Sequence, residues 1–435
     1  MFFPMLKGTR LQRVTETKLP GLDRRESAAT PGFREMENLC SEGYPALRTR
    51  PGRGLVETLK KPNGLLAKDA LLWVDGKHLY MNGLEVGPEL TDGEKSLVSM
   101  GAYVVVFPDK VYVNTQDVTD CGSLECERTA PAGSGLALCD ETGTVYSGVT
   151  ESAGAPEEPR EGALWLDLSG TEPVLRQYSR EVWTALEGVC VKVQATGIGT
   201  GFAAGDGVEV SGCSVARLNG ETVLQAADTD WVAFPGTVAG GAVTETVMKL
   251  RRFVPEMDYV VQSGNRLWGC KYGMVDGKPV NEIYASKLGD CKNWRCFAGL
   301  ATDSYAAARG SDGVFTGAVS YLGNPIFFKE RYMERVYASG SGAHQIVTTE
   351  CSGVQKGSAR SLQVVGGVLY YLSGDGVQAF DGSLPVCVSQ ALGAERYHGG
   401  VAGCWQEKYY LSALDREEKP SLLVYDSARQ LWHRE

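Results

Sequence analysis

The stretch Leu71-Leu-Trp-Val-Asp-Gly-Lys-His-Leu-Tyr-Met81 contains the pattern from which the fold is predicted. Two apolar runs flank the polar turn Asp75-Gly-Lys77, and an Asp-Gly pair supplies the positive φ that a tight hairpin turn requires. Short runs rich in β-branched and aromatic residues on either side of such a turn are typical of paired antiparallel strands. The sequence therefore predicts a β-hairpin at this place.

Five further stretches repeat the plan of an apolar run, a polar connection and a second apolar run. They cover residues 103–113, 266–286, 325–337, 368–380 and 408–425. The last four begin roughly 40 to 60 residues apart, close to the repeat of about 40 to 50 residues of a four-stranded propeller blade. A β-sandwich would also contain hairpins, but six exceed what one sandwich of roughly 100 residues uses. We predict an all-β protein with a β-propeller of about six blades.

The composition supports many short strands joined by turns. Glycine makes up 54 of the 435 residues, and 19 tyrosines accompany it. Long helices tolerate glycine poorly, whereas tight turns need it. No stretch approaches the roughly 20 apolar residues of a membrane span, and the segment from Met1 to Lys7 does not resemble a signal peptide. We expect no membrane partner, synthesis in a reducing cytoplasm, and cysteines that are mostly buried thiols.

The hairpins stop for a long stretch after the second one, and this interruption divides the chain. The interruption opens with Gly-, Pro- and acid-rich sequence and continues as a compact β segment. We predict an extended N-terminal arm at 1–54, first propeller blades at 55–117, an inserted small β domain at 118–250 and the remaining blades at 251–435. Within the arm, Phe33 to Leu39 could form one or two helical turns between flanking prolines.

Signals for catalysis are weak. The chain has four histidines, at positions 78, 344, 398 and 433, and neither a G-x-S-x-G elbow nor an H-E-x-x-H motif. The glycine-rich stretch 197–207 lacks the Lys-Ser/Thr and the helix of a phosphate-binding loop, so a turn between strands is the better interpretation. We expect no catalytic residues, no cofactor and no enzymatic activity. A propeller glycoside hydrolase or lyase, with two carboxylates about 5 to 9.5 Å apart, is a minor alternative.

The cysteine pattern does not favour a metal site. The close pairs are Cys121 with Cys126 and Cys291 with Cys296, and Cys139 lies near the first pair. Their spacing differs from the C-x2-C of zinc ribbons. We therefore expect thiols and no bound metal.

Charge is unevenly distributed along the chain. The net charge of -10 disfavours a protein that wraps nucleic acid with a continuous basic face. The arm nevertheless contains a basic set, namely Arg24, Arg25, Arg48, Arg50 and Arg53. These arginines could contact DNA, or they could form bidentate pairs with carboxylates of a neighbouring subunit. We favour the second possibility, which makes them candidate subunit-interface residues.

Several of these stretches resemble tail and neck proteins of tailed bacteriophages. In the arm, the resemblance rests on three stretches, Gly21-Leu-Asp-Arg-Arg25, Glu35-Met-Glu-Asn-Leu39 and Tyr44-Pro-Ala-Leu-Arg-Thr-Arg-Pro-Gly52. The propeller is similar to blades of podophage tail nozzle and tail stabilisation proteins in Asn265-Arg-Leu-Trp-Gly269, Asn281-Glu-Ile-Tyr-Ala-Ser-Lys-Leu-Gly-Asp290, Asn293-Trp294, Val354-Gln-Lys-Gly-Ser-Ala-Arg-Ser-Leu362 and Val377-Gln-Ala-Phe-Asp-Gly382. The inserted segment resembles phage structural modules only loosely, through Gly162-Ala-Leu-Trp-Leu-Asp167 and Gln177-Tyr178.

The resemblance implies a structural virion protein without catalytic residues. Several copies, commonly six, would form a ring in the tail or neck, bind the portal, adaptor or other tail proteins, and let viral DNA pass without sequence-specific contacts. The protein would be made in the host cytoplasm and located in the virion. An acidic lumen would repel DNA phosphate, in keeping with the negative net charge.

The alternative is a receptor- or glycan-binding protein at the tail tip. Exposed aromatic side chains would then stack on sugars, and the candidates are Trp73, Trp268, Trp294 and Trp405. Aromatic residues on strands more often belong to the core.

Overall fold

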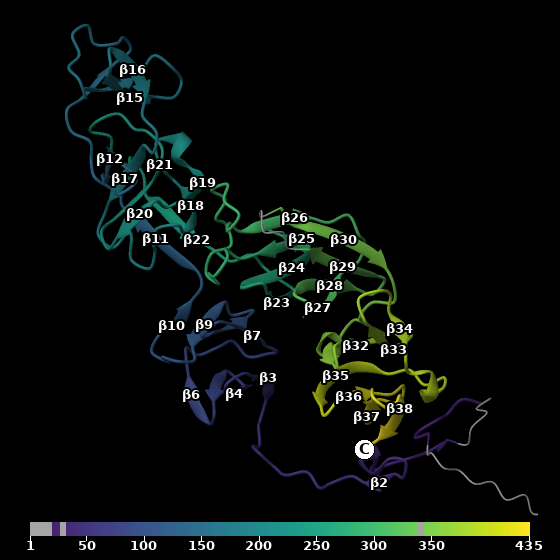
Figure 1. Cartoon of the computed structure of the whole chain (residues 1–435). Coiled ribbons are helices and arrows are strands. Elements are labelled where there is room, and N and C mark those ends of the chain that lie inside the picture. Colours follow the sequence, from purple (N-terminus) through teal and green to yellow (C-terminus); the bar gives the residue numbers. More distant parts are fainter. Residues whose placement is uncertain (1–19, 27–31, 338–342) are drawn as a thin grey trace, which may run out of the picture. The chain divides into compact units, whose positions relative to one another are not determined.

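The computed structural model describes residues 20–26, 32–337 and 343–435 (Figure 1). Over this part of the chain, β-strands and four short 3-10 turns make up the secondary structure, without an α-helix. The turns are η1 (Ser41–Gly43), η2 (Ala216–Leu218), η3 (Ala359–Ser361) and η4 (Gln390–Leu392). No described helix is long and apolar enough to span a bilayer. The predicted all-β fold class is confirmed.

Contacts divide the chain into two compact units. Unit 1 comprises Met1–Glu57, Phe328–Met333 and Thr348–Glu435, and unit 2 comprises Thr58–Phe327 and Glu334–Val347. Each of the six predicted hairpins supplies the two central strands of a separate four-stranded sheet, whose strands are adjacent in chain order. Such an up-and-down sheet is typical of a propeller blade, and we number the six sheets as blades 1 to 6.

Blades 1 to 3 precede residue 309. Blade 1 consists of β3 (Pro62–Ala67), β4 (Leu71–Asp75), β5 (His78–Met81) and β6 (Leu84–Val86). Blade 2 consists of β7 (Ser96–Met100), β8 (Tyr103–Phe107), β9 (Val111–Asn114) and β10 (Cys121–Ser123). Blade 3 consists of β23 (Tyr259–Ser263), β24 (Arg266–Val275), β25 (Lys278–Ala285) and β26 (Tyr305–Ala308).

Blades 4 to 6 follow in the same order. Blade 4 consists of β27 (Phe315–Tyr321), β28 (Asn324–Lys329), β29 (Tyr332–Tyr337) and β30 (Gln345–Glu350). Blade 5 consists of β31 (Gln363–Val365), β32 (Val368–Ser373), β33 (Gly376–Phe380) and β34 (Val386–Cys387). Blade 6 consists of β35 (His398–Trp405), β36 (Lys408–Leu414), β37 (Pro420–Asp426) and β38 (Leu431–Arg434).

The apolar run in β8 shows how blades of unit 2 pack face to face. Val104 and Val105 are neighbours on this strand and therefore point to opposite faces of the sheet. Val104 belongs to an apolar cluster with Leu72 of blade 1, and Val105 belongs to another with Leu267 of blade 3. Both valines are fully buried. A strand covered on both faces needs a continuous apolar run, and this accounts for the sequence from Tyr103 to Phe107.

The first strands of successive blades contact one another, as in a propeller. In unit 2 the contacts run from β3 to β7, from β7 to β23 and from β23 to β27, and in unit 1 β31 contacts β35. None of the six first strands contains Asp, Glu, Lys or Arg. The acidic charge of the chain therefore lies outside these strands.

Three further sheets lie between blades 2 and 3 in the chain and form the inserted domain. The first sheet has the order β11 (Cys126–Ala130), β22 (Met248–Arg252), β18 (Gly207–Ser211) and β19 (Gly220–Val223). The second has the order β12 (Gly135–Cys139), β17 (Cys190–Gln194), β21 (Trp231–Pro235) and β20 (Ala226–Asp228). The third has the order β13 (Val149–Ser152), β14 (Leu164–Asp167), β15 (Val174–Ser179) and β16 (Val182–Ala185), with β13 parallel to β14. Buried residues of all three sheets share one apolar cluster.

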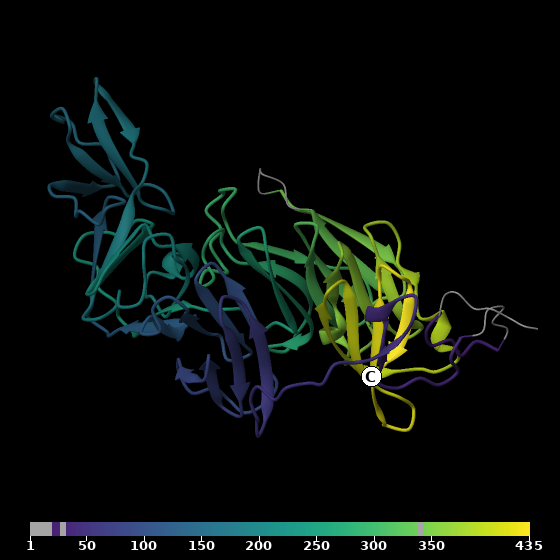
Figure 2. The ribbon, with the colours of Figure 1, turned by 60° about the horizontal axis from the view of Figure 1, so that its bottom comes forward.

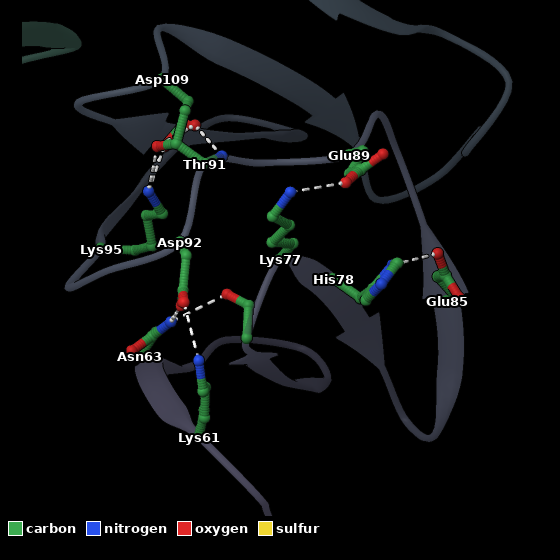
Figure 3. A network of polar contacts seen from close by, with 11 residues as sticks. Lys61, Asn63, Lys77, His78, Glu85, Glu89, Thr91, Asp92, Lys95 and Asp109 are labelled. Carbon is green, nitrogen blue, oxygen red and sulfur yellow. Dashed lines mark hydrogen bonds and ion pairs between the residues drawn. The ribbon is translucent and has the colours of Figure 1, made fainter.

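A polar network fixes the connection 87–95 between blades 1 and 2 (Figure 3). The Lys95 ammonium lies 2.7 Å from the Asp109 carboxylate, and the two side chains are 1% and 5% exposed. Asp109 also accepts hydrogen bonds from the backbone N–H and the hydroxyl of Thr91. At the other end of the network, Asp92 accepts hydrogen bonds from Lys61 and Asn63 of blade 1. The connection is thus held by both blades.

The described part of the arm binds blade 6 within unit 1 (Figure 2). The backbone N–H of Leu22 donates to the carbonyl of Trp432, and the Ser41 hydroxyl donates to Asp426. Leu22 is fully buried, in the same apolar cluster as Trp432. A Cβ at Gly21 would lie 2.4 Å from the Trp432 carbonyl oxygen, so the arm approaches the blade as closely as glycine allows.

The expected helical turns in the arm are absent, which corrects that prediction. Phe33 forms an isolated bridge with Leu22, and Leu39 begins β1 (Leu39–Cys40), which pairs with β2 (Arg48–Thr49). Backbone groups that pair with another segment are not available for the bonds of a helix.

Candidate functional site

The connection between β25 and β26, residues 286–304, lies in unit 2 and contacts both blade 3 and the inserted domain, and we call it the bridging loop. Arg266 holds it from within blade 3. Its guanidinium donates to the backbone carbonyls of Ser286, Asp303 and Ala301. The Arg266 side chain is buried, and this burial lowers its pKa, with Asp303 acting in the opposite direction. A buried cation surrounded by carbonyls keeps the loop in one conformation.

The bridging loop also binds the inserted domain. Asn293 is buried, accepts a hydrogen bond from the backbone N–H of Gly207, and donates to the carbonyl of Gly205. A Cβ at Gly207 would lie 2.1 Å from the carbonyl oxygen of Arg295, so this approach requires glycine. The Lys287 ammonium donates to Gly205 as well. These contacts fix the inserted domain against blade 3.

A cavity of about 340 Å³ opens beside this contact, and we call it the junction pocket. It is lined by Tyr103, Gly201, Phe202, Ala203, Asp206, Arg252, Gly289, Asp290, Cys291 and Lys292. The lining comes from blade 2, from the inserted domain and from the bridging loop, all within unit 2. Its volume lies near the lower end of the range of about 300 to 1,000 Å³ that is typical of small-molecule sites.

One wall of the pocket is built around a buried ion pair. The Arg252 guanidinium bonds to the Asp206 carboxylate, and each side chain is 7% exposed. Asp206 also accepts hydrogen bonds from the backbone N–H of Ala203 and from Asn293. Burial raises the pKa of Asp206, although the charge of Arg252 acts to lower it. The Phe202 ring lies 5.7 Å from the guanidinium carbon and adds an apolar surface to this wall.

Another part of the lining combines an aromatic ring with a cation. Tyr103 and Tyr112 meet edge to face, and the Lys292 ammonium lies 3.9 Å from the ring centroid of Tyr112 and 5.9 Å from that of Tyr103. The Tyr103 hydroxyl donates to Asp120, which raises the pKa of the tyrosine. Asp290 accepts a hydrogen bond from the backbone N–H of Lys292. Aromatic surface next to a carboxylate and an ammonium suits a ligand with both apolar faces and hydroxyl groups.

The five arm arginines are not gathered into one cluster, and several bind groups of their own chain. Arg24 pairs with Glu395, Arg25 pairs with Asp23 through two hydrogen bonds, and Arg53 pairs with Glu435 at 2.6 Å. Arg50 donates to the side chain of Asn38. Arg48 lies on β2 and is exposed, and its side chain makes no hydrogen bond or ion pair among the described residues. Their predicted role at a subunit interface stays a prediction.

Three of the four tryptophans considered for sugar stacking belong to the core. Trp73, Trp268 and Trp294 are 9%, 1% and 1% exposed, whereas Trp405 is 67% exposed. Trp73 and Trp268 lie on central strands of blades 1 and 3, and Trp294 lies in the bridging loop, where it packs in the apolar cluster of Val105 and Leu267. The suggestion that they stack on sugars is therefore wrong for all but Trp405.

The buried histidine His433, the glycine-rich stretch 197–207 and the cysteines were the other places considered for catalysis or for binding of a phosphate or a metal. His433 is fully buried, and burial lowers its pKa. The stretch 197–207 forms turns between strands, as predicted. Over the described residues, no group of three or more His, Cys, Asp or Glu side chains is arranged to hold a metal ion, and the cysteines are free thiols.

Sequence reasoning did not find the junction pocket. Its charged residues, Asp206, Arg252, Asp290 and Lys292, come from separate places in the chain and form no local motif. The available signal was indirect. The stretch from Asn281 to Asp290 and the pair Asn293-Trp294 carry part of the resemblance to tail proteins, and both lie in or beside the bridging loop.

Comparisons with known proteins give little guidance. No known protein family matches the chain, and no curated protein matches its sequence. Among solved structures, one similar chain is named "Phage phi92 endosialidase", with 10% sequence identity and a TM-score of 0.17. The match covers 84% of this chain and 42% of that chain, so this chain spans less than half the length of that protein. Nothing in these comparisons concerns a nozzle, a neck ring or the passage of DNA.

The expectation that the protein has no enzymatic activity is corrected. The solved structure just named is an enzyme by its title, which is contrary to that expectation, and we no longer hold it. A TM-score of 0.17 establishes neither a shared fold nor the same activity.

Proposed function

We propose that the chain is a phage tail protein of the virion that binds a glycan on the surface of the host cell, and that the junction pocket is its binding site. The observation that carries the proposal is the composition of this pocket. Phe202 and Tyr103 contribute aromatic rings to the lining, which also contains Asp290 and Lys292. Sugars bind through the apolar faces of their rings and through hydroxyl groups that both donate and accept hydrogen bonds, and these four side chains match both properties.

The phage assignment is supported by the resemblance of the arm and the blades to tail and neck proteins.

The rigidity of the pocket supports its role in glycan binding, because no affinity is lost to the ordering of side chains in a preformed site. Asn293, which is outside the lining, donates a hydrogen bond to Asp206 and helps to hold this lining residue in place.

The test is binding of the purified full chain to surface polysaccharides extracted from bacteria, measured with labelled protein. Phe202→Ala is expected to lower the affinity by about two- to tenfold, in line with the ~0.5–1.5 kcal/mol of an aromatic contact. Phe297→Ala is the matched control, because Phe297 is 49% exposed and lies outside the pocket. The proposal fails if no polysaccharide binds, or if both variants bind like the original chain.

A ring in the tail or neck is the second candidate function. It is favoured by Leu55 and Val56, which are 83% and 84% exposed in the segment after the arm, since adjacent apolar side chains of this exposure suit a contact with another copy. The copies would then assemble with portal, adaptor or other tail proteins around passing DNA. Light scattering decides this point. A ring mass that is lost in a Leu55→Ser/Val56→Ser variant supports the ring, and a monomer at all concentrations argues against self-assembly without a partner.

A further inference from the structure

The charges that line the junction pocket are balanced. Two of its residues are acidic, Asp206 and Asp290, and two are basic, Arg252 and Lys292. The lining therefore has no net charge. A charged ligand meets a charge of its own sign as well as one of the opposite sign, so the attraction that offsets the loss of its hydration is reduced, whereas the desolvation of a neutral polar ligand costs much less.

The acid and base of the buried pair have their partners within the protein. Besides Asp206, the Arg252 guanidinium bonds the carbonyls of Leu124 and Gly201. Asp206 is bonded by Ala203 and Asn293 in addition to Arg252. Both carboxylate oxygens of Asp206 and the Nε and Nη1 atoms of Arg252 are thus occupied, and the charges of the two groups compensate each other.

The charged residues of the lining outside this ion pair are Asp290 and Lys292, which lie two positions apart on the bridging loop. One oxygen of Asp290 accepts the backbone N–H of Lys292, and the other has no hydrogen-bond partner among the described residues. The Lys292 ammonium lies over aromatic rings, and its hydrogen-bond donors have no acceptor among those residues. An acceptor and a donor in one lining match two hydroxyl groups of one ligand, of which the first donates to the carboxylate and the second accepts from the ammonium.

We propose that the ligand of the junction pocket is a neutral saccharide, bound through adjacent hydroxyl groups to Asp290 and Lys292 and by its apolar ring face to Phe202. This inference rests on the proposed function and narrows it. An acidic sugar would bring its carboxylate to a lining that contains the Asp290 carboxylate as well as the Lys292 ammonium, and the repulsion by the first offsets the attraction to the second. A cavity of about 340 Å³ is large enough for a short saccharide.

The experiment is an array of neutral oligosaccharides and their sialylated or uronic-acid counterparts, probed with the full chain. Binding to neutral members is expected, at least tenfold stronger than to the acidic counterparts. The affinity is expected to stay within twofold between low and high salt, because salt screens interactions between charges.

Two variants assign the binding to the pocket. Asp290→Asn keeps an oxygen for the backbone N–H of Lys292 but replaces the free carboxylate oxygen, and Lys292→Gln removes the cation. Each is expected to weaken binding at least tenfold with an unchanged melting temperature. Asp69→Asn is the control, because Asp69 is exposed in unit 2 and away from the pocket lining.

The outcomes separate this inference from the proposed function. Preferential binding of acidic glycans that is lost in Phe202→Ala would leave the proposed function standing and overturn the neutral saccharide. Neutral binding that both loop variants retain would also overturn it. Absence of binding to every glycan would overturn both.

Discussion

The Asp206 carboxylate and the Arg252 guanidinium form an ion pair in which each side chain is 7% exposed. Burial raises the pKa of Asp206 even though Arg252 acts to lower it, so desolvation outweighs the attraction within the pair. A pair of this kind gives little net stability compared with apolar residues, but removal of one partner leaves a buried charge without compensation.

Arg252→Met is therefore expected to destabilise the protein by about 3–5 kcal/mol, measured by urea unfolding. The double variant Arg252→Met/Asp206→Asn should recover part of this loss, because no buried charge remains and asparagine still accepts the N–H of Ala203. Equal stability of the single and double variants would contradict the account.

Arg266 is expected to act on the pocket indirectly, as a positioning residue. It holds the bridging loop, and the loop contributes Asp290 and Lys292 to the lining. Arg266→Ala leaves the carbonyls of Ser286, Ala301 and Asp303 without their donor, at a cost of at least about 1–3 kcal/mol. Glycan affinity should fall in parallel, although Arg266 does not line the pocket. Arg160→Ala, at an exposed position, should change stability by less than about 0.5 kcal/mol. Loss of stability without loss of affinity would show that the loop does not need this anchor for binding.

The blades could be predicted from the sequence because their signals are local. The Gly76 turn has the positive φ that its Asp-Gly sequence indicates, and the apolar run at Val104 and Val105 reflects a strand buried on both faces. The pocket could not be predicted, because Phe202 and Asp290 are brought together only by docking of the inserted domain on blade 3. Local pattern contains no information about such a contact.

The arm illustrates the same limit. Its arginines predict carboxylate partners, and two of them do pair with glutamates. The partners in the chain itself, Glu395 for Arg24 and Glu435 for Arg53, lie more than 350 residues away in sequence. Pairing across such a separation depends on the folded chain, so charge composition could indicate the kind of partner but not its position.

The pair of Lys95 and Asp109 should make stability depend on pH in the acid range. Burial alone would raise the pKa of Asp109, but hydrogen bonds from Lys95 and Thr91 outweigh it, and the pKa lies below its usual value of 3.8. The folded state thus binds this proton less readily than the unfolded state. The stabilisation is complete above about pH 4 and is lost as the pH falls through the lower folded value.

Urea unfolding of the original chain and of Asp109→Asn from neutral pH down to about pH 2 measures this contribution. The difference in the free energy of unfolding should be largest at neutral pH and should shrink as the solution becomes more acidic. Asp69→Asn, at an exposed position, should show no such trend. A difference that is constant with pH would mean that the carboxylate charge is not what stabilises the connection between blades 1 and 2.

Two thiols of the inserted domain are expected to be unreactive while the protein is folded. Cys139 and Cys190 lie opposite each other on β12 and β17, both almost fully buried. Burial raises the pKa of Cys139 to about 12 and that of Cys190 to about 11, so neither forms an appreciable amount of thiolate at neutral pH. Since the thiolate is the nucleophile, alkylation should reach the exposed Cys404 first and these two only after unfolding.

Mass spectrometry of labelled peptides gives the order in which the cysteines are alkylated, and Cys404→Ser should remove the fast reaction. Rapid labelling of Cys190 in the native protein would mean that this part of the inserted domain opens far more readily than its burial implies.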